Sequence, residues 1–396
     1  MRAHLPRLLR NFAVDPSQAW TVDLSHPAEA FMPDTPEVKG YHRLRRLLGV
    51  VSSGVDVATL LVLLLTGWTL GLRDFAERWT THSTLALLIY LIALGLISFV
   101  VSLPLDFFKG FWLEHRFKLS NLTFRAWVQD QVKGLGVGGF LALLAAQIVY
   151  ATLRHWPEQW WIIAGAAFMF FFVVLANLAP ILILPLFFKF KPLENQALAE
   201  RLLELSRRAG TRVRGVFEWK LSEKSKKANA ALLGLGNTRR IILSDTLLEN
   251  LNEDEVEAVL AHELGHHVRH HLLQKLAIQA AATFVGFYLA DQALRRWDST
   301  FGFRGLADFA NLPLLILVGA ALAFVLLPLV NIHSRACERQ ADAYALEAIR
   351  ERAAFVSAME KLAAMNLAER QPPAWIEFVF HSHPSVEERI RYAQRT

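Results

Sequence analysis

Residues 259–271 are rich in a side chain that binds metal ions. The stretch V-L-A-H-E-L-G-H-H-V-R-H-H holds five histidines within ten positions. Histidines four residues apart lie on one face of a helix, one turn from each other, where both imidazoles can reach a single Zn²⁺. Three pairs have this spacing: His262 with His266, His266 with His270, and His267 with His271.

Only one of these pairs comes with a general base. Glu263 directly follows His262, so its carboxylate would lie beside a metal held by His262 and His266 and could take a proton from a zinc-activated water. The other two pairs have a histidine or a valine at that position. A solvated helix face is the alternative for such a motif, but Asn252 and Glu255 have capping-box spacing for a helix that leads into it. We therefore predict two zinc ligands and a base here, and place the later histidines at the mouth of a membrane span.

Catalytic zinc needs a third protein ligand and keeps one position open for water. The candidate is Glu338, in the stretch R-A-C-E-R-Q-A-D-A-Y at residues 335–344. Asp342 follows one turn later on the same expected helix and could orient a ligand histidine through a hydrogen bond. An ordinary exposed acidic face is the alternative for this pair. Cys337 would point about 100° away from Glu338 on a helix, so we interpret it as a packing residue.

Membrane helices must position these residues. The chain has 396 residues and is 54% hydrophobic, above the share usual for soluble proteins. A helix of ~20 apolar residues spans a bilayer, and six apolar blocks approach or exceed that length: 47–72, 79–105, 134–153, 159–188, 276–290 and 309–334. We predict an all-α polytopic membrane protein with about six transmembrane helices, joined to a small α+β portion that holds the zinc site.

The candidate ligands fall in two segments outside the apolar blocks, 189–271 and 333–396. Two apolar blocks separate these segments. The segments therefore lie on the same side of the membrane only if the short block 276–290 crosses the bilayer. A shared zinc site requires this crossing. Lys and Arg concentrate in the loops on this side, which the positive-inside rule places in the cytoplasm together with both termini. The same loops explain the formal net charge of +6, so we do not interpret it as a nucleic-acid binding signal.

The predicted organisation has five parts. A polar N-terminal lead-in at 1–42 precedes transmembrane helices one to four at 43–188, and a cytoplasmic segment with the H-E-L-G-H helix follows at 189–271. Transmembrane helices five and six at 272–332 lead to a C-terminal segment with the third ligand at 333–396. We expect no cleavable signal peptide in residues 1–40, and the single cysteine excludes an intramolecular disulfide. Local patterns predict a helix at 197–208, a strand at 213–219, and a hairpin of 229–235 with 239–243 around Gly236 and Asn237.

Several stretches together resemble the integral-membrane zinc endopeptidases of the type I CAAX prenyl protease family. They are H-E-L-G-H at 262–266, S-R-A-C-E-R-Q-A-D-A-Y-A at 334–345, H-S-H-P-S-V-E-E-R-I at 381–390, and N-A-A-L-L-G-L-G-N-T-R-R-I-I-L-S-D-T-L-L at 229–248. Upstream, E-H-R-F-K-L-S-N at 114–121 and A-P-I-L-I-L-P-L-F at 179–187 are also similar. The resemblance covers most of the chain from about residue 40.

The resemblance implies a helical barrel around a large intramembrane chamber that the zinc site faces. It also implies that the zinc ligands are His262, His266 and Glu338, that Glu263 is the general base, and that Asp342 is a second acidic position. His383, before Pro384, matches the histidine that steadies the substrate carbonyl or the tetrahedral intermediate, and Arg389 matches an arginine near the site. Asn229 and Ala230 match the edge strand that pairs with the substrate backbone.

We therefore predict a membrane-embedded endopeptidase with one Zn²⁺ per chain, acting on peptide or membrane-protein substrates, prenylated or CAAX-like ones included. It would face the cytoplasm from the inner membrane of a bacterium or the endoplasmic reticulum of a eukaryote. Three alternatives remain: a heat-shock type quality-control zinc protease, an inactive scaffold, and a metal transporter with a histidine-rich cytoplasmic loop. A transporter would place paired polar groups inside its spans, where only Asp56, His82 and Asn177 stand out.

Overall fold

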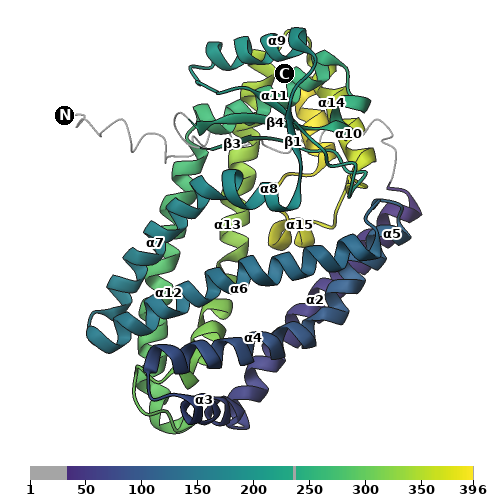
Figure 1. Ribbon diagram of the computed structural model, residues 1–396. Helices are drawn as coiled ribbons and strands as arrows, with labels where there is room; N and C mark the ends of the chain where they lie inside the picture. The colour runs from purple at the N-terminus through teal and green to yellow at the C-terminus, as the bar shows by residue number, and fades with distance from the viewer. Residues whose placement is uncertain (1–33, 235–237, 396) are drawn as a thin grey trace, which may run out of the picture.

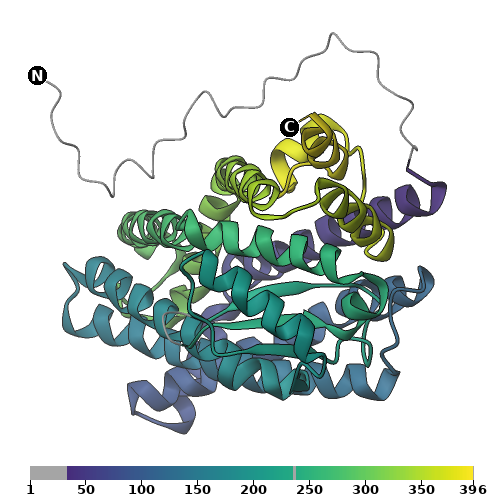
Figure 2. The same cartoon turned by 90° about the horizontal axis from the view of Figure 1, so that it is seen from above.

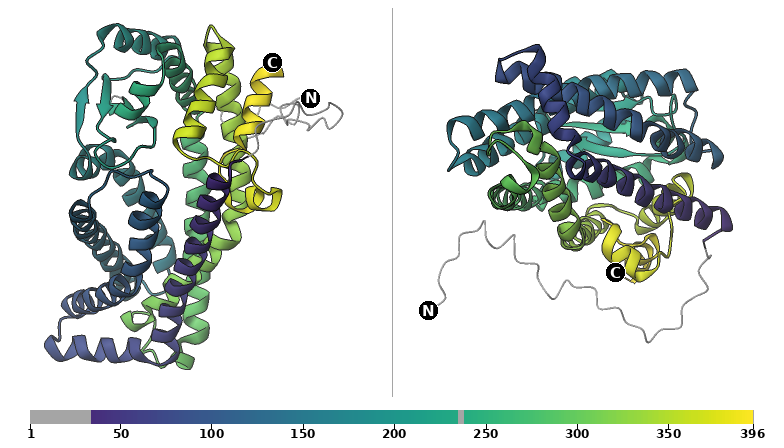
Figure 3. Two further views of the ribbon diagram at one scale, coloured as in Figure 1. Left: turned by 90° about the vertical axis from the view of Figure 1, so that its right-hand side faces the viewer. Right: turned by 90° about the horizontal axis from the view of Figure 1, so that it is seen from below.

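The structure is a computed structural model that describes residues 34–234 and 238–395. Six helical stretches are long and apolar enough to cross a membrane, the number that the sequence predicts: Pro36–Leu65, Ser83–Arg116, Phe124–His155, Trp160–Phe187, His271–Phe301 and Phe309–Ala348. At most 22% of the most apolar part of any of them is buried, and Figures 1 and 3 show them splayed rather than closely bundled. Such sparse packing fits helices arranged around an open interior.

The spanning helices extend beyond the apolar blocks of the sequence. The first, α2 (Pro36–Leu65), has 30 residues and is therefore about 45 Å long, whereas the hydrocarbon core of a bilayer is ~30 Å thick. Helix formation therefore continues into the polar residues on either side of the bilayer. Of the lead-in predicted at 1–42, residues 1–33 lie outside the described residues, and residues 36–42 are the first turns of α2.

The apolar block 47–72 is not one helix, which corrects the sequence prediction. Gly67 has a φ of +73° and separates α2 from α3 (Trp68–Trp79), and a left-handed conformation of this kind favours glycine. Helix α3 lies across the end of the molecule opposite the sheet (Figures 1 and 3). It buries Thr69 and Arg73, so its polar side faces the protein while Trp79 is exposed.

The remaining helices of the first half form the other spans. They are α4 (Ser83–Phe107), α5 (Leu113–Arg116), α6 (Phe124–His155), α7 (Trp160–Leu178) and α8 (Leu184–Phe187). Single π-helical turns at Phe108–Trp112 and Ala179–Ile183 join α4 to α5 and α7 to α8. The second turn contains Pro180, whose missing N–H cannot make the regular α-helical hydrogen bond.

A four-stranded sheet follows the fourth span, in the order β1-β2-β4-β3. Its strands are β1 (Phe190–Pro192), β2 (Val216–Trp219), β3 (Ala230–Leu233) and β4 (Arg240–Ser244). The pairs β1–β2 and β3–β4 are antiparallel, and β2–β4 is parallel. The predicted hairpin strands pair as expected, with Ala230 opposite Leu243, while its turn lies outside the described residues. The strand predicted from Val213 begins only at Val216.

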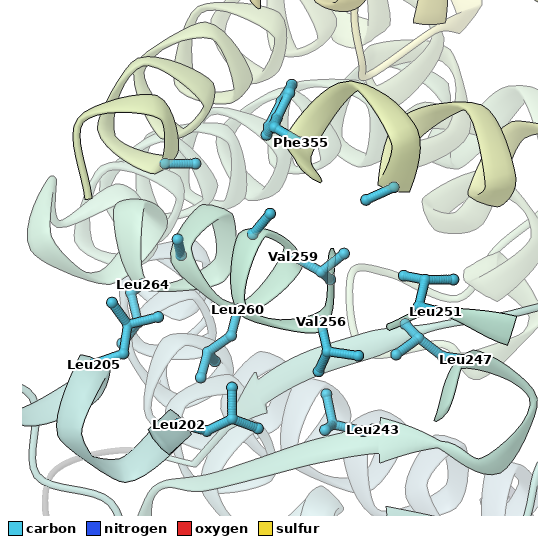
Figure 4. Close-up of a cluster of buried hydrophobic side chains, with 14 of the residues drawn as sticks. Leu202, Leu205, Leu243, Leu247, Leu251, Val256, Val259, Leu260, Leu264 and Phe355 are labelled. Carbon is cyan, nitrogen blue, oxygen red and sulfur yellow. The ribbon is translucent and has the colours of Figure 1, made fainter. Parts of the chain in front are cut away.

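The core outside the spans lies between one face of the sheet and two helices. Helices α9 (Gln196–Arg208) and α11 (Glu253–Val268) pack on this face, with the short α10 (Asp245–Asn250) after β4. Figure 4 shows how α9, β4, α10 and α11 contribute to one cluster, through the side chains of Leu202, Leu205, Leu243, Leu247, Val256, Leu260 and Leu264. The predicted capping box of Asn252 and Glu255 is present at the start of α11.

The last part of the chain covers the other side of α11. Two long helices, α12 (His271–Phe301) and α13 (Leu312–Ala348), run back and forth along the molecule, so the short block 276–290 belongs to a helix long enough to cross a membrane. Helices α14 (Arg352–Met365), α15 (Ala374–Phe380) and α16 (Val386–Arg395) follow. Figure 2 shows these C-terminal helices on the side of α11 away from the sheet, where Phe355 joins the core.

Candidate metal centre

A glycine allows the two helices of the candidate site to approach closely. A Cβ at Gly265 would lie 2.9 Å from the Cα of Ala341, 3.0 Å from its carbonyl oxygen and 3.2 Å from the Cβ of Tyr344. Real side chains do not come this close to a backbone, because packed interiors leave no such overlap. The absence of a side chain at Gly265 therefore brings α11 against α13 at the level of the H-E-L-G-H motif.

The close packing brings together three of the predicted ligands. His262, His266 and Glu338 each offer a ligand atom, and these atoms lie within 4.8 Å of one another. The two Nε2 atoms are 3.2 Å apart, and each lies 3.3 Å from an oxygen of Glu338. His262 and Glu338 are buried and His266 is half-buried. His266 and Glu338, which are 72 positions apart in the sequence, thus point at one small volume.

Each histidine is held by its other ring nitrogen. The Nδ1 of His262 lies 2.8 Å from Oδ1 of Asp342, so Asp342 occupies the orienting position that the sequence predicts. The Nδ1 of His266 lies 2.9 Å from Nδ1 of His271, whose Nε2 is 3.1 Å from Oε1 of Gln340. If each Nδ1 carries the proton, both Nε2 atoms present lone pairs to the shared volume, the arrangement that metal-binding histidines use.

The sequence predicts no role for His271, whereas in the structure its ring contacts the ring of His266. It is buried, whereas it was expected at the mouth of the following span. Its contact with His266 depends on a break between α11 and α12 at His270, which has a φ of +56°. No helical spacing rule anticipates a contact between residues five apart across such a break.

Arg389 is half-buried and lies against the carboxylate of Asp342. Its Nε and Nη2 atoms donate to the two oxygens of Asp342 at 2.8 and 2.6 Å, the paired geometry in which Arg binds carboxylates best. Burial lowers the pKa of Arg389, but the neighbouring Asp342 outweighs it and the pKa is raised. The sequence placed Arg389 near the site, and the structure shows that it fixes Asp342 and thereby the ring of His262.

The carboxylates make the site favourable for positive charge. Burial lowers the pKa of His262, but the hydrogen bonds to Asp342 and Glu338 outweigh this and raise the pKa to about 9. A proton and a metal ion compete for the same nitrogen. Surroundings that stabilise a protonated His262 stabilise a bound cation for the same electrostatic reason.

Glu263 follows His262 on α11, and its carboxylate remains available for chemistry. It is half-buried, and within residues 34–234 and 238–395 it takes part in no hydrogen bond or ion pair. Its negative charge helps to raise the pKa of Arg389. A carboxylate without a partner beside a cation site is free to accept a proton.

His383 reaches the site from the loop after α15. Its Nδ1 lies 2.8 Å from Oε2 of Glu338, while its side chain is 62% exposed. Two buried residues of α13 hold the end of α15 that precedes it: Arg335 donates to the carbonyl oxygens of Glu377 and His381 at 2.8 and 2.6 Å, and Asn331 donates to that of Val379 at 2.6 Å. Sequence reasoning missed both anchoring residues, because the contacts join positions more than 40 apart.

The predicted edge strand is an edge in the structure. The sheet ends at β3, so only one side of β3 is paired with a strand of the described chain. Asn229 precedes β3, and its amide donates to Oγ of Ser244 at 3.0 Å, while the amide of Ser244 donates to the carbonyl oxygen of Asn229 at 2.9 Å. Ala230 pairs with Leu243. The outer side of β3 can accept a further extended segment.

The polar residues inside the spans do not form a second metal site. Asp56 accepts a hydrogen bond from Ser102 at 2.8 Å, Asn177 donates to the carbonyl of Val173 in its own helix, and His82 precedes α4 at the opposite end of the molecule. Among the described residues, only His262, His266 and Glu338 form a group able to hold a metal. The metal-transporter hypothesis therefore has no ligand set within the described spans.

The three candidate ligands fit a metal ion in donor type and direction. Two imidazoles and one carboxylate are the ligand set of many catalytic zinc sites. A cation placed between the two Nε2 atoms, which lie 3.2 Å apart, and Glu338 would be shared by all three groups. The chain itself holds both Nδ1 atoms, which leaves the Nε2 atoms for the ion.

Comparisons with known proteins identify the family of the chain. The family model of peptidase family M48 matches residues 192–396. The family model of the CAAX prenyl protease N-terminal region, with five membrane helices, matches residues 36–189. Within that range the present chain has four candidate spans and the short α3. The two family models together cover almost all of the residues that the structure describes.

Individual relatives are similar over most of their length. An uncharacterized metalloprotease of Bacillus subtilis is 30% identical over 387 residues, which is 97% of this chain and 89% of that protein. CAAX prenyl protease 1 of Saccharomyces cerevisiae is 31% identical over 328 residues, 76% of this chain and 71% of that protein. The crystal structure of Ste24p from S. mikatae superposes with a TM-score of 0.81 at 25% identity, covering 90% of this chain and 88% of that one. The chain therefore belongs to peptidase family M48, as a multi-pass membrane metalloprotease of the CAAX prenyl protease type.

Proposed function

We propose that the chain is a zinc-dependent endopeptidase that hydrolyses peptide bonds of membrane-associated substrates, including prenylated CAAX-like ones. The observation that carries the proposal is the convergence of His262, His266 and Glu338 on one volume with Glu263 beside it. Membership of the metalloprotease family supports a metal. Zinc is the ion that two histidines and one carboxylate most commonly bind at catalytic sites in proteases.

In this proposal the chain supplies the metal ligands and their orientation. His262 and His266 bind through Nε2 and Glu338 through a carboxylate oxygen, while Asp342 and His271 hold the rings. A zinc ion there supplies Lewis acidity, which polarises a carbonyl and lowers the pKa of water. Arg389 balances the charge of Asp342, so the site does not bury an uncompensated carboxylate.

Two further residues would move or stabilise charge during hydrolysis. Glu263 accepts a proton from the attacking water and can return it to the amine that leaves, so it is regenerated in each turnover. The exposed ring of His383 can donate a hydrogen bond to the oxygen on which negative charge develops. Its contact with Glu338 and the anchoring of α15 by Arg335 keep it near the ligands.

The outer side of β3 would hold the substrate. An extended peptide that adds to β3 makes main-chain hydrogen bonds regardless of its side chains, and Asn229 and Ala230 lie at the start of this strand. Such binding suits the hydrolysis of many sequences, with selectivity coming from elsewhere. Substrates tethered to the bilayer would reach the site from the spans below it, on the cytoplasmic side by the positive-inside rule.

The purified protein in detergent or a lipid nanodisc provides the test. We would measure zinc per chain by elemental analysis and cleavage of a fluorescence-quenched CAAX-like peptide, in farnesylated and unmodified forms. Glu263→Gln should lower kcat at least about 100-fold, within the range for loss of a general base, and should leave zinc content near one per chain. Glu249→Gln, an exposed change on α10, serves as the control.

The outcomes separate the competing functions. Zinc retention with lost cleavage in Glu263→Gln supports the proposal, and near-normal turnover would overturn the mechanism. Equal cleavage of the two peptide forms, with efficient cleavage of destabilised membrane helices, would favour the heat-shock type quality-control protease. A wild-type protein that binds zinc but cleaves none of these substrates would favour the scaffold.

A further inference from the structure

A cavity of about 410 Å³ lies on the face of the sheet opposite the core. Figure 1 shows α8 beneath β1 and β3, where this cavity is found. The lining comes from the end of the fourth span and from all four strands: Pro180, Ile181, Pro185, Phe188, Lys189, Phe190, Phe217, Leu233, Gly234, Thr238, Arg240 and Ile242. The walls are mainly apolar and aromatic, and two of the lining residues are cations. The candidate metal ligands do not line it.

Arg240 brings an unsatisfied donor into this cavity. Its Nε is buried and has no hydrogen-bond partner, and its guanidinium lies 5.2 Å from the centre of the Phe217 ring. Within the described part of the chain it forms no ion pair. A buried donor of a charged group costs free energy when it is left unpaired. An anion in the cavity would remove that cost.

Lys189 adds a second positive charge at the same cavity. Its Nζ lies 2.8 Å from an oxygen of Glu223, in a pair whose side chains are 75% and 46% exposed. An ion pair this exposed contributes little and exchanges readily with solvent. Lys189 can therefore turn toward an anion held by Arg240, while Glu223 stays hydrated.

The apolar part of the cavity adjoins a surface that faces lipid. Ile181, one of its lining residues, is 41% exposed, and the neighbouring Leu182 and Leu186 are 59% and 50% exposed. All three belong to the last turns of the span Trp160–Phe187. The cations lie just beyond that span, at the level where lipid headgroups begin. The ligand should therefore be apolar toward the span and anionic toward the sheet.

We propose that this cavity binds an anionic phospholipid, with its phosphate on Arg240 and Lys189 and an acyl chain along Ile181. The site is separate from the metal ligands, so binding does not depend on proteolytic activity. Occupancy would link the sheet that carries β3 to the bilayer. Phosphatidylglycerol, whose phosphate charge is not offset by a headgroup cation, should bind more tightly than zwitterionic phosphatidylcholine.

Native mass spectrometry of the detergent-purified full chain tests this directly. Wild-type protein is incubated with short-chain phosphatidylglycerol, with short-chain phosphatidylcholine, or with glycerol phosphate, which presents the anion without the chains. We expect phosphatidylglycerol to bind at least about tenfold more tightly than phosphatidylcholine, because Arg240 and Lys189 repel the choline cation. Glycerol phosphate should bind more weakly than phosphatidylglycerol. Equal binding of glycerol phosphate would overturn the lipid assignment.

Three variants locate the binding. Arg240→Gln should abolish the preference for phosphatidylglycerol, Arg240→Lys should keep part of it, and Arg212→Gln, which removes an exposed charge from the same segment, should leave it unchanged. Size-exclusion profiles identify any variant that is misfolded, and Lys189→Gln then provides a second, exposed position at which the preference should fall. An unchanged preference in folded Arg240→Gln or Lys189→Gln would overturn the proposal. So would an Arg240→Gln effect on peptide KM without lipid, since the cavity would then serve the substrate.

Discussion

Gly265 of α11 lies directly against Ala341 of α13, and a Cβ at Gly265 would come within 2.9 Å of the Ala341 Cα. The contact lies between the two helices that carry the candidate metal ligands, one residue from His266 and three from Glu338. The approach of the helices and the assembly of the site are therefore one structural requirement. The glycine in H-E-L-G-H is as necessary for the geometry as the histidines are for the chemistry.

Gly265→Ala should separate α11 from α13 and disrupt the metal site. Overpacking of this kind typically costs about 1–3 kcal/mol of stability, and the displaced Glu338 should lower metal affinity as well as cleavage. Thermal unfolding, zinc content and peptide cleavage measure the three effects. Gly319→Ala on the partner helix α13 is a matched control, since its added Cβ meets nothing within 4 Å. Full zinc occupancy in Gly265→Ala would show that the helices can adjust without loss of the site.

His271 and His270 should differ sharply when each is changed to alanine. His271 is buried and contacts Nδ1 of His266, and loss of such a partner typically weakens metal binding 10- to 100-fold. His270 is exposed and should have no effect on affinity. Competition of each variant with a zinc-binding dye measures the difference. Equal affinities would mean that the ring of His266 is oriented without His271.

Arg335→Gln should reduce turnover through the position of His383. The change removes the donors that hold the carbonyl groups of Glu377 and His381, so the loop with His383 loses its anchor while the three candidate metal ligands stay in place. We expect kcat to fall with little change in zinc content. The exposed Arg350→Gln on the same stretch of chain is the control.

A double-mutant cycle decides whether Arg335 acts through His383. If it does, Arg335→Gln should cost almost nothing in kcat once His383 is already alanine, because coupled residues are not additive. Full additivity of the two losses would mean that Arg335 supports the fold in general. Unfolding temperatures of all four proteins in the cycle reveal any general loss of stability.

The sequence predicts the parts of the site that depend on local periodicity. A four-residue spacing on a capped helix, together with Glu263 after the first histidine, selects His262 and His266, and the capping box of Asn252 is observed as predicted. The local pattern around Glu338 is equally typical of an exposed acidic face, and the role of His383 follows only from the resemblance, because no local pattern joins residues from separate segments. The order of the sheet could not be derived from its strands alone, since β2 pairs in parallel with β4 rather than with the next strand in sequence.

Other features depend on single backbone conformations that a count of apolar residues does not detect. The left-handed Gly67 ends α2 inside an apolar block, and glycine was the visible signal there. The left-handed His270 turns the chain so that His271 meets His266, and a histidine gives no such signal, since non-glycine residues seldom adopt positive φ. Long-range anchors such as Arg335 need the tertiary structure itself.

The last prediction concerns the sides of the membrane on which the segments lie. The charge distribution places α9 and α14 together in the cytoplasm and the end of α12 on the opposite side. The approach of α11 to α13 independently requires the first two to share a side. Single cysteines at the exposed positions Glu204, Glu360 and Ser299, in a Cys337→Ala background, can be labelled in intact vesicles with a membrane-impermeant maleimide. We expect Glu204→Cys and Glu360→Cys to react from the cytoplasmic face only, and Ser299→Cys from the other face only. Labelling of Ser299→Cys and Glu204→Cys from the same side would mean that α12 does not cross the bilayer, and the proposed orientation would then be wrong.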